Sequence, residues 1–329
     1  MTGTALAHPN IALIKYWGKR EGGGNLPATG SLSITLDALN TRTRVEFDST
    51  LSRDELLLDG KSDPAALARV GSCLDVLRDL AGDHRRARVE TNNDFPTAAG
   101  LASSASGFAA LVTAANAALG LRLDRRTLSK LARRASGSAA RSLYGGFVVL
   151  HAGRNDDDDP AAQPLLDADE WPLSVVIAVT ASEPKRTSSR AGMQSGRSTS
   201  PFYRAWLDGA DHDLAIAQAS VLARDFAQLA EISEHNCLKM HAVMHSSRPP
   251  LIYWNGATVE CMHRVRELRG RAGVQVFFTI DAGPQVKAIC VPQDAPRVAA
   301  ALRDVAGVES VLISGIGEGA KLLRSEETA

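Results

Sequence analysis

The sequence predicts an α+β protein built from two lobes. Strand-like and helical stretches alternate in both halves of the chain, and a run of four aspartates that ends at Pro160 separates the halves. After this charged run the pattern restarts at Leu173 with a continuous apolar stretch typical of a buried strand. The chain has 329 residues, of which 44% are hydrophobic, so it can fill two medium cores. We therefore expect an N-terminal lobe over residues 1–172 and a C-terminal lobe over residues 173–329.

The elements of each lobe follow from the spacing of apolar residues. In the N-terminal lobe we expect strands at 11–17, 32–36, 43–47, 56–58, 88–91 and 143–151, and helices at 64–80 and 108–119. In the C-terminal lobe we expect strands at 173–180, 274–280 and 286–291, and helices within 210–245 and 257–270. The aspartate run is interpreted as a solvated loop near the domain boundary, because its carboxylates lack the spacing of a calcium loop.

Composition narrows the kind of partner and the compartment. The 37 Lys and Arg residues balance 37 Asp and Glu residues, so no net field draws the protein to nucleic acid or to a membrane, and a small-molecule partner is favoured. The four cysteines are scattered without C-x-x-C spacing and are expected to be buried thiols of a reducing compartment. Because the start lacks signal-peptide regions and no stretch approaches roughly 20 apolar residues, a cytoplasmic protein is expected.

The segment 96–107 is made of small residues without a charge and lies between a predicted strand and a predicted helix. The first N–H groups of a helix lack partners and meet the positive end of its dipole, so an anion is stabilised there. Serine hydroxyls add contacts for phosphate oxygens or Mg²⁺. This is no Walker A loop, because no G-K-[ST] follows. A tight turn that packs the helix on a sheet is the alternative, so these residues alone support phosphate binding and nothing finer.

Residues 92–107, NNDFPTAAGLASSASG, resemble the nucleotide loop of the GHMP kinase superfamily and, within it, of the diphosphomevalonate decarboxylase branch, apart from the extra residue Asp94. The resemblance implies a two-lobed GHMP kinase fold, with a ribosomal S5-like N-terminal lobe, a ferredoxin-like C-terminal lobe and the active-site cleft between them. It also implies that ATP and Mg²⁺ bind here, with Ser104 at the metal. The implied nucleotide contacts are Pro96, Gly100, Leu101, Ala102, Ser103, Ser104 and Ser106.

Residues 10–19, NIALIKYWGK, resemble the branch's opening segment N-I-A-x-x-K-Y-W-G-K. Lys15 and Lys19 lie four apart and can offer two ammonium groups to an anionic substrate, although two solvated lysines are the commoner outcome of such spacing. Trp17 and Gly18 between them favour a turn that lines a pocket. The resemblance implies that Lys15 supports the catalytic aspartate, and that Tyr16 and Lys19 contact substrate.

Residues 136–146, SGSAARSLYGG, are similar to the branch's G-S-G-S-A-C-R-S-L-x-G-G, with Ala140 in place of cysteine. A guanidinium can grip a carboxylate in a bidentate fork that lysine does not reproduce. A surface arginine is the alternative interpretation. The resemblance implies that Arg141 clamps the substrate carboxylate and that Ser136 and Ser138 contact its phosphates.

Residues 183–193, EPKRTSSRAGM, follow a predicted strand and are basic and rich in hydroxyls. Composition alone predicts an exposed, mobile loop. The branch's S-S-x-x-G-M motif implies that Ser189 is catalytic and that Arg190 and Met193 lie at the substrate. Lys185 is implied at the nucleotide phosphates, as closure of the loop excludes water.

Residues 279–284, TIDAGP, put one carboxylate at the end of a predicted strand. An aspartate that caps the following turn is the alternative. The branch's D-A-G-P implies that Asp281 accepts or orients the proton of the substrate hydroxyl; Gln285 stands where the branch has asparagine. His241 and His245 lie four apart on a predicted helix, but no third ligand or H-E-x-x-H glutamate accompanies them, so a zinc site is not expected.

These five segments occur in order between Asn10 and Pro284. Together they imply ATP-dependent decarboxylation of mevalonate 5-diphosphate to isopentenyl diphosphate, in the mevalonate pathway of isoprenoid biosynthesis. Three alternatives stay open: a decarboxylase of mevalonate 5-phosphate, a GHMP small-molecule kinase without decarboxylation, and a nucleotide-binding regulatory protein. Residues 26–33, LPATGSLS, depart from the L-P-x-N-S-S of many relatives and leave the choice of phosphorylated mevalonate open. A homodimer is expected by analogy with the family.

Overall fold

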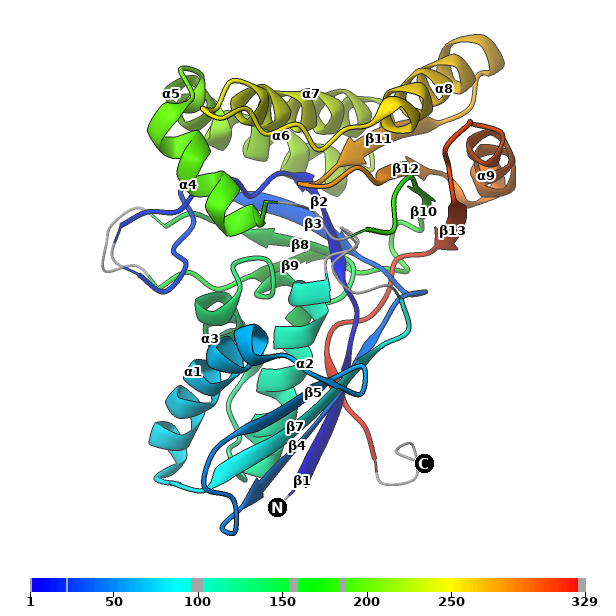
Figure 1. Cartoon of the computed structure of the whole chain (residues 1–329). Coiled ribbons are helices and arrows are strands. Elements are labelled where there is room, and N and C mark those ends of the chain that lie inside the picture. The colour runs from blue at the N-terminus through cyan, green and yellow to red at the C-terminus, as the bar shows by residue number, and fades with distance from the viewer. Residues whose placement is uncertain (1, 22, 96–102, 154–158, 184–186, 325–329) are drawn as a thin grey trace.

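The computed structural model describes residues 2–21, 23–95, 103–153, 159–183 and 187–324. Within these residues the strands form three sheets. A six-stranded sheet lies at one end of the molecule, and two four-stranded sheets lie toward the other end, beneath a layer of helices (Figure 1).

The six-stranded sheet has the order β14-β1-β4-β7-β5-β6. Its strands are β1 (Thr2–Ala7), β4 (Thr41–Asp48), β5 (Glu55–Leu58), β6 (Lys61–Ser62), β7 (Arg86–Asn93) and β14 (Lys321–Leu322). The sheet packs against three helices, α1 (Pro64–Ala81), α2 (Ser103–Ala118) and α3 (Arg125–Ala135). The missing side chain of Gly3 lets α2 approach β1 closely, because a Cβ at Gly3 would lie 2.2 Å from the Ala114 carbonyl oxygen. This close packing fixes the second half of α2 on the sheet.

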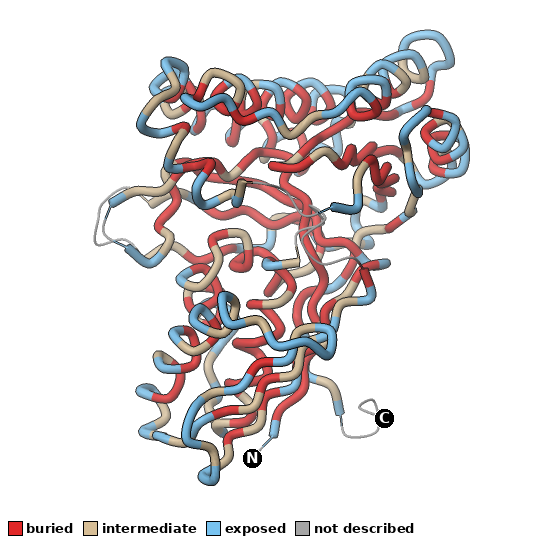
Figure 2. The backbone as a smooth tube through the Cα atoms, viewed as in Figure 1, coloured by how far each residue is buried: buried red, intermediate tan, exposed pale blue. Residues whose placement is uncertain are grey.

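The second sheet has the order β2-β3-β8-β9 and lies in the middle of the molecule (Figure 1). Its strands are β2 (Asn10–Ile14), β3 (Ser31–Thr35), β8 (Phe147–Leu150) and β9 (Gln163–Leu166). Every residue of β2, β3 and β8 is buried, and Figure 2 shows this buried backbone running through the centre. The core over this sheet draws apolar side chains from both halves of the chain, among them Leu13, Phe147, Ile177 and Leu229.

The third sheet has the order β11-β12-β10-β13. Alternate residues of β10 face two different cores, since Val175 and Ile177 pack with the middle sheet whereas Val176 and Ala178 pack toward helices α8 and α9. The remaining elements are β10 (Ser174–Val179), α4 (Ser189–Thr199), α5 (Tyr203–Asp208), α6 (Ala210–Ala223), α7 (Phe226–His245), α8 (Gly256–Ala272), β11 (Val276–Ile280), β12 (Val286–Cys290), α9 (Ala295–Arg303) and β13 (Ser310–Ser314). β14 then returns to pair with β1.

Most of the predicted elements are confirmed, but two strand predictions are wrong in extent. The strand predicted at 11–17 ends at Ile14, because the next N–H, that of Lys15, donates to the Asn236 side chain. The strand predicted at 143–151 starts at Phe147, since residues 141–143 form a turn of 3₁₀ helix. The helices predicted within 210–245 are confirmed: there are two, divided at Arg224, whose φ of 55° lies in the left-handed region.

The cysteines, the helices and the aspartate run bear on the predictions from composition. All four cysteines are buried and carry free thiols, as predicted. None of the described helices is both long enough and apolar enough to cross a bilayer. The boundary between residues 172 and 173 stays a prediction. Residues 156–158 of the aspartate run lie outside the described residues, and Asp159 forms an ion pair with Arg133 near the end of α3.

Candidate active site

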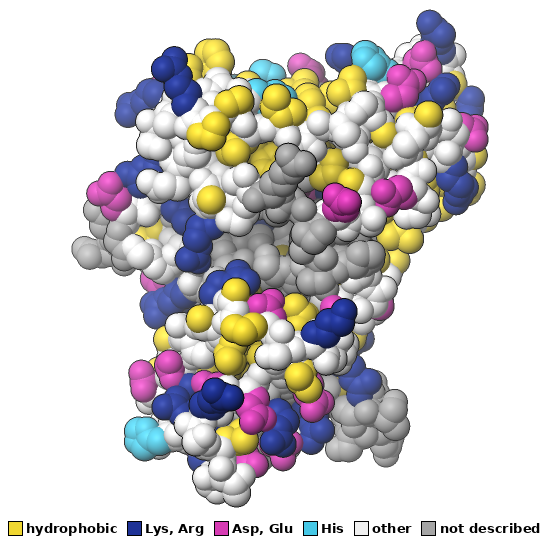
Figure 3. All heavy atoms as spheres, viewed as in Figure 1, with side chains coloured by type: hydrophobic (Ala, Val, Ile, Leu, Met, Phe, Trp, Pro, Cys, Tyr) yellow, Lys and Arg dark blue, Asp and Glu magenta, His cyan; other side chains and the backbone are white. Residues whose placement is uncertain are grey.

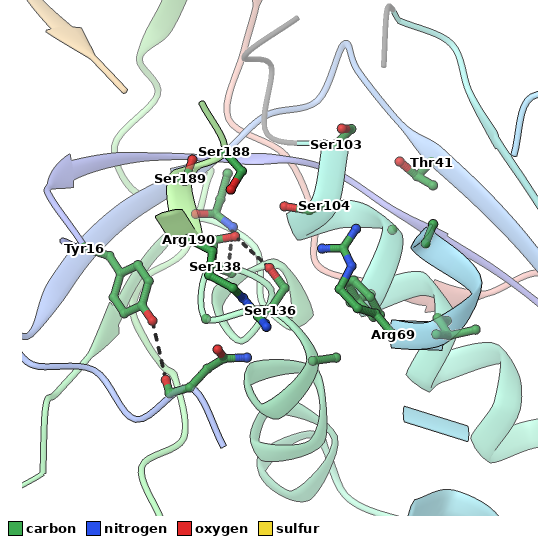
Figure 4. A pocket seen from close by; sticks show the side chains of 18 of the residues that line it. Tyr16, Thr41, Arg69, Ser103, Ser104, Ser136, Ser138, Ser188, Ser189 and Arg190 are labelled. Atoms are coloured by element: carbon green, nitrogen blue, oxygen red, sulfur yellow. Dashed lines mark hydrogen bonds between the residues drawn. The ribbon is translucent and has the colours of Figure 1, made fainter. Parts of the chain in front are cut away.

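A cavity of about 830 Å³ lies where the six-stranded sheet meets the two other sheets. Its walls come from the ends of β2 and β11, the turn after α3, the start of α4 and the start of α2. Figure 4 shows two sides of it, with Tyr16, Ser136, Ser138 and Ser189 on one side and Ser103, Ser104, Thr41 and Arg69 on the other. On the face seen in Figure 3, Lys and Arg side chains gather at the same waist of the molecule. The cavity therefore has a hydroxyl-rich, cationic lining.

Asp281 follows the last residue of β11 and reaches the cavity with its side chain 27% exposed. Its Oδ1 accepts a hydrogen bond from Lys15 Nζ at 2.7 Å, and its Oδ2 lies 3.3 Å from Lys287 Nζ. Burial alone would raise the pKa of the Asp281 carboxyl, but the two lysines outweigh it and hold that pKa well below its usual range. The carboxylate is therefore an ionised acceptor throughout the neutral range.

Side chains of helix α7 contact the backbone of β11, the strand that precedes Asp281. β11 is an edge strand, so its outer N–H and C=O groups need partners from outside the sheet. Glu234 accepts from the N–H of Phe278 at 3.1 Å, and Cys237 Sγ accepts from the N–H of Ile280 at 3.2 Å. The ring of His241 lies 3.3 Å from the Ile280 carbonyl oxygen. These side chains are spaced along one face of α7, so this helix supports the strand that precedes Asp281.

The same helix holds Lys15. The Oδ1 of Asn236 accepts from the Lys15 backbone N–H at 2.8 Å, and its Nδ2 donates to Asp213 at 2.7 Å. Lys239 Nζ lies 2.7 Å from the same Asp213 oxygen. The Lys15 side chain, only 1% exposed, is thereby aimed at Asp281 rather than at solvent. The prediction of two solvated lysines is excluded for Lys15.

Arg141 lies in the short 3₁₀ turn after α3 and is 2% exposed. Its guanidinium donates to Ser31 Oγ at 2.6 Å, Ser33 Oγ at 3.0 Å and Asn10 Oδ1 at 3.3 Å. All three acceptors are neutral, and no carboxylate among the described residues lies within 4 Å of it. Burial lowers the pKa of Arg141 to about 10. A buried cation that borders a cavity, with no described carboxylate within 4 Å, is suited to bind an anion.

The hydroxyl-rich side of the cavity holds Tyr16, Lys19, Ser136, Ser138 and Arg190. The two serine hydroxyls lie 3.3 Å apart, and Tyr16 packs so closely on the turn between them that a Cβ at Gly137 would lie 2.3 Å from its hydroxyl oxygen. Burial lowers the pKa of Lys19 to about 8, and Arg190 adds to this effect. Two neighbouring cations on one wall of a cavity favour an anion between them.

Asn25 completes this side and was missed by the sequence analysis. It accepts a hydrogen bond from Lys19 Nζ, and its own Nδ2 donates to the carbonyl of Arg134 at 2.7 Å. Its φ of 52° is in the left-handed region, where asparagine is tolerated. The only sequence signal was the G-G-G-N turn before Leu26, which gives no hint that the amide reaches a lysine.

The segment 183–193 is not simply an exposed loop, which corrects the prediction from composition. Ser188 caps helix α4 by accepting from the Ala191 N–H at 3.2 Å, so Ser189 and Arg190 form the first turn. Met193 is buried at 8% exposure in a cluster with Trp17. A Cβ at Gly192 would lie 3.1 Å from the Trp17 ring, so the glycine lets the helix pack closely against that ring. Ser189, Arg190 and Met193 all line the cavity.

The other side of the cavity begins at α2. Ser103 and Ser104 line it at the first residues of the helix, where N–H groups lack intrahelical partners. Ser106 is fully buried, and its hydroxyl lies 2.6 Å from that of Thr41, so it secures the helix to β4. The predicted contacts Pro96, Gly100, Leu101, Ala102 and Lys185 lie outside the described residues.

Beyond the helix start the cavity becomes apolar, a feature that the sequence analysis did not predict. The lining residues there include Leu56, Leu58, Val89, Phe108 and Leu111. Arg69 of α1 lies with its guanidinium carbon 5.6 Å from the Phe108 ring centre. An apolar slot beside an anion-binding helix start is the shape required by a flat base attached to phosphates.

Family models match both halves of the chain. Residues 7–162 match the diphosphomevalonate decarboxylase-like N-terminal domain, and residues 175–322 match the mevalonate 5-diphosphate decarboxylase C-terminal domain. The chain is 36% identical over 324 residues to the diphosphomevalonate decarboxylase of Aspergillus fumigatus, covering 92% of this chain and 80% of the relative.

The chain belongs to the diphosphomevalonate decarboxylase family. The human diphosphomevalonate decarboxylase is a further relative, 36% identical over 301 residues, with 85% of this chain and 74% of the relative covered. Among solved structures, the mevalonate diphosphate decarboxylase from Staphylococcus aureus matches with a TM-score of 0.91 at 39% identity over 98% of both chains. A structure described as MDDEF in complex with MVAPP, AMPPCP and magnesium matches with a TM-score of 0.91 at 40% identity over 99% of both chains.

Membership of the diphosphomevalonate decarboxylase family confirms the predicted fold, a two-lobed GHMP kinase fold. The departure from the family pattern at Thr29 and Gly30 lies away from the cavity lining among the described residues. A Cβ at Gly30 would lie 2.5 Å from a methyl group of Leu214, so this position packs against α6. The next residue, Ser31, keeps the contact with Arg141.

In this family member the histidine pair has a packing role. The rings of His241 and His245 pack around Trp254, with centroids 4.5 Å and 4.9 Å from it. Burial lowers the pKa of His241 to about 3, so its ring is neutral. Within the described residues no group of three or more His, Cys, Asp or Glu side chains could hold a metal ion.

Proposed function

We propose that this protein catalyses the ATP-dependent decarboxylation of mevalonate 5-diphosphate, giving isopentenyl diphosphate, ADP, phosphate and CO₂. The observation that carries the proposal is the pairing of two opposite charges on one cavity. Asp281 is a carboxylate held ionised by two lysines, and Arg141 is a buried guanidinium whose hydrogen-bond partners among the described residues are neutral. A substrate with a hydroxyl for the first and a carboxylate for the second satisfies both.

The substrate's own carboxylate is assigned to Arg141. Because Ser31, Ser33 and Asn10 hold the guanidinium from behind, it keeps a fixed orientation for an incoming anion. Ser189 at the start of α4 is assigned as a neighbouring hydroxyl donor. Lys15 is assigned to the support of Asp281, in line with its 2.7 Å contact.

The diphosphate is assigned to the side of the cavity with Tyr16, Lys19, Ser136, Ser138 and Arg190. Two cations and three hydroxyl groups there offer the donors that a diphosphate needs. Met193 contributes apolar contact beneath the first turn of α4. These assignments agree with the motifs, and the 5-phosphate would leave part of the donor set without a partner.

The residues at α2 fit ATP with Mg²⁺. The free N–H groups of the helix start, the hydroxyls of Ser103 and Ser104, and the apolar slot at Phe108 match phosphates and a base. Ser104 is assigned to the metal and Lys185 to the phosphates, together with the loop contacts predicted at 96–102. ATP supplies the phosphoryl group, and Mg²⁺ neutralises charge on its phosphates.

The chain's own residues act by position and charge. Asp281 accepts a hydrogen bond from the substrate's 3-hydroxyl and turns its oxygen lone pair toward the nucleotide side. Because the pKa of Asp281 is so low, the carboxylate is a weak base. It orients the hydroxyl by accepting a hydrogen bond and does not retain the proton of that hydroxyl. Arg141 holds the carboxylate until CO₂ leaves, and α4 covers the site to exclude water.

A panel of substrates tests the proposal. Release of ADP and CO₂ is measured with mevalonate, its 5-phosphate and its 5-diphosphate under the same conditions. We expect both products with the 5-diphosphate, at a kcat/KM well above the other two. A preference for the 5-phosphate would move the function to the corresponding monophosphate decarboxylase. ADP without CO₂ would indicate a kinase, and ATP binding without ADP a regulatory protein.

The assembly and location of the protein are proposals by analogy with the family. We expect a homodimer, which sedimentation measurements test, and a cytoplasmic enzyme. The partners are small molecules, since the balanced charge of the chain gives no footprint for nucleic acid.

A further inference from the structure

Lys287 is a buried lysine in the middle of an apolar strand. It belongs to β12, where its neighbours along the strand are Val286 and Ala288, and its own side chain is 0% exposed. In the sheet it is flanked by Thr279 of β11 and Ile177 of β10. Its Nζ lies 3.3 Å from Asp281 Oδ2 and donates to the Gln285 carbonyl oxygen at 3.3 Å.

A fully buried lysine in an apolar strand is energetically unfavourable on its own. Moving an ammonium group from water into a protein interior is unfavourable by several kcal/mol unless an opposite charge compensates it. A valine or leucine would fill a β-sheet position with no such cost. The carboxylate within 4 Å of Lys287 among the described residues is Asp281, the same group that Lys15 contacts through the other oxygen.

The two lysines come from different directions. Lys15 approaches from the end of β2 and binds Oδ1, whereas Lys287 approaches from β12 and lies next to Oδ2. One contact leaves a carboxylate free to rotate about its last bond, but contacts to both oxygens fix its plane. The other ionisable groups near it are Arg141 and, from α7, Cys237 and His241; burial raises the pKa of Cys237 and lowers that of His241, so both are neutral.

We propose that Lys287 is a positioning residue of the reaction, which acts with Lys15 to fix the plane of the Asp281 carboxylate toward the substrate hydroxyl. The inference rests on the proposed function, because it assigns to Lys287 an effect on the step that Asp281 serves. Lys287 has no contact with substrate in this scheme. Burial lowers the pKa of Lys287 and Asp281 opposes that shift, in agreement with a pair that depends on mutual contact.

The variant Lys287→Met tests this role, because methionine keeps the length of the side chain and removes the charge. We expect kcat to fall by roughly 10- to 100-fold, since small misplacement of a reacting group has effects of this size, while KM for ATP changes by less than about threefold. The matched control is Arg78→Met, which removes a buried cation from Asp54 outside the cavity. It is expected to lower the melting temperature without changing kcat.

A stability cycle makes the test independent of activity. Melting temperatures are compared for Lys287→Met, Asp281→Asn and the double variant. If the two side chains form a pair, the double variant loses less than the sum of the single losses, because neither charge is left alone. Additive losses, or a kcat of Lys287→Met within about twofold of wild type, would overturn the inference. If the wild type releases no CO₂, the proposed function is wrong. The melting temperatures then still show whether Lys287 and Asp281 form an interacting pair.

Discussion

A buried guanidinium that borders the cavity is the most informative feature at the scale of single residues. Arg141 donates to three neutral acceptors and has no carboxylate within 4 Å among the described residues, an arrangement suited to an incoming anion. The sequence suggested an anion clamp at this position through its motif. It did not reveal Ser31 and Ser33, because serines in a strand pattern carry no sign that they face an arginine more than 100 residues away.

Replacing Arg141 by lysine tests the clamp. The lysine keeps the charge but loses the planar fork, so we expect a loss of about 1–3 kcal/mol in transition-state binding. This loss is a fall of roughly 5- to 150-fold in kcat/KM for the phosphorylated mevalonate. The matched control is Arg134→Lys, whose side chain is exposed on α3. Equal kinetics of the two variants would rule out the clamp.

Asp281→Asn tests the role of the carboxylate. The amide is isosteric but neutral, and one of its two polar groups would donate rather than accept. We expect turnover to be abolished while the dissociation constant for ATP stays within about threefold, because Asp281 is assigned no contact with the nucleotide. Fluorescence titration with an ATP analogue measures the second quantity. Near-normal turnover would remove Asp281 from its assigned role.

Lys19 predicts a pH dependence. Its pKa of about 8 lies below the ordinary value for lysine, so its positive charge is lost as the pH rises through about 8. Because phosphates bind the charged form, kcat/KM for the substrate should fall above this pH while kcat at saturation stays level. Lys19→Arg keeps its charge and should remove the alkaline limb. A limb that persists in this variant would assign the titration to another group.

At the scale of elements, helix α7 determines where the two charged partners meet. It contacts the backbone of Lys15 through Asn236 and the strand before Asp281 through Glu234 and Cys237. Apolar periodicity predicted this helix, but periodicity reports only which face is buried. The polar residues on its buried face, whose partners lie in β2 and β11, follow from the three-dimensional packing.

Asn236→Ala tests this support. The change leaves the Lys15 N–H and the Asp213 carboxylate without their buried partner, which costs about 1–3 kcal/mol of the free energy of unfolding. We expect a lower melting temperature together with a lower kcat, because Lys15 loses its anchor. His235→Ala, at an exposed neighbouring position of the same helix, is the control. Loss of stability with unchanged kcat would contradict the link from α7 to the active site.

Elements missed by the sequence analysis share a physical cause. β1 reads TGTALA, a stretch with few β-branched residues, and it is a strand because β4 and β14 pair with it on both sides. Helix α4 reads SRAGMQSGRST, whose glycines and serines lower its helix propensity. Its two glycines, Gly192 and Gly196, instead fit against the Trp17 ring, so tertiary packing outweighs propensity there.

At the scale of the whole molecule, the cavity belongs to both halves of the chain. Lys15 and Arg141 come from the N-terminal half, while Ser189 and Asp281 come from the C-terminal half. The middle sheet shares its core with the third sheet, so the halves are held at a fixed relation by apolar packing. The sequence predicted both sets of residues through their motifs. The second cation on Asp281 and the apolar slot for a base required the folded chain.

The central claim is that one cavity couples phosphoryl transfer to loss of CO₂. A single-turnover experiment with excess enzyme, ATP and mevalonate 5-diphosphate labelled in its carboxylate measures this most directly, because ADP and CO₂ are counted in the same sample. We predict one CO₂ for each ADP in the wild type, with neither product in Asp281→Asn. Formation of ADP without an equal amount of CO₂ would contradict the account and leave a kinase in its place.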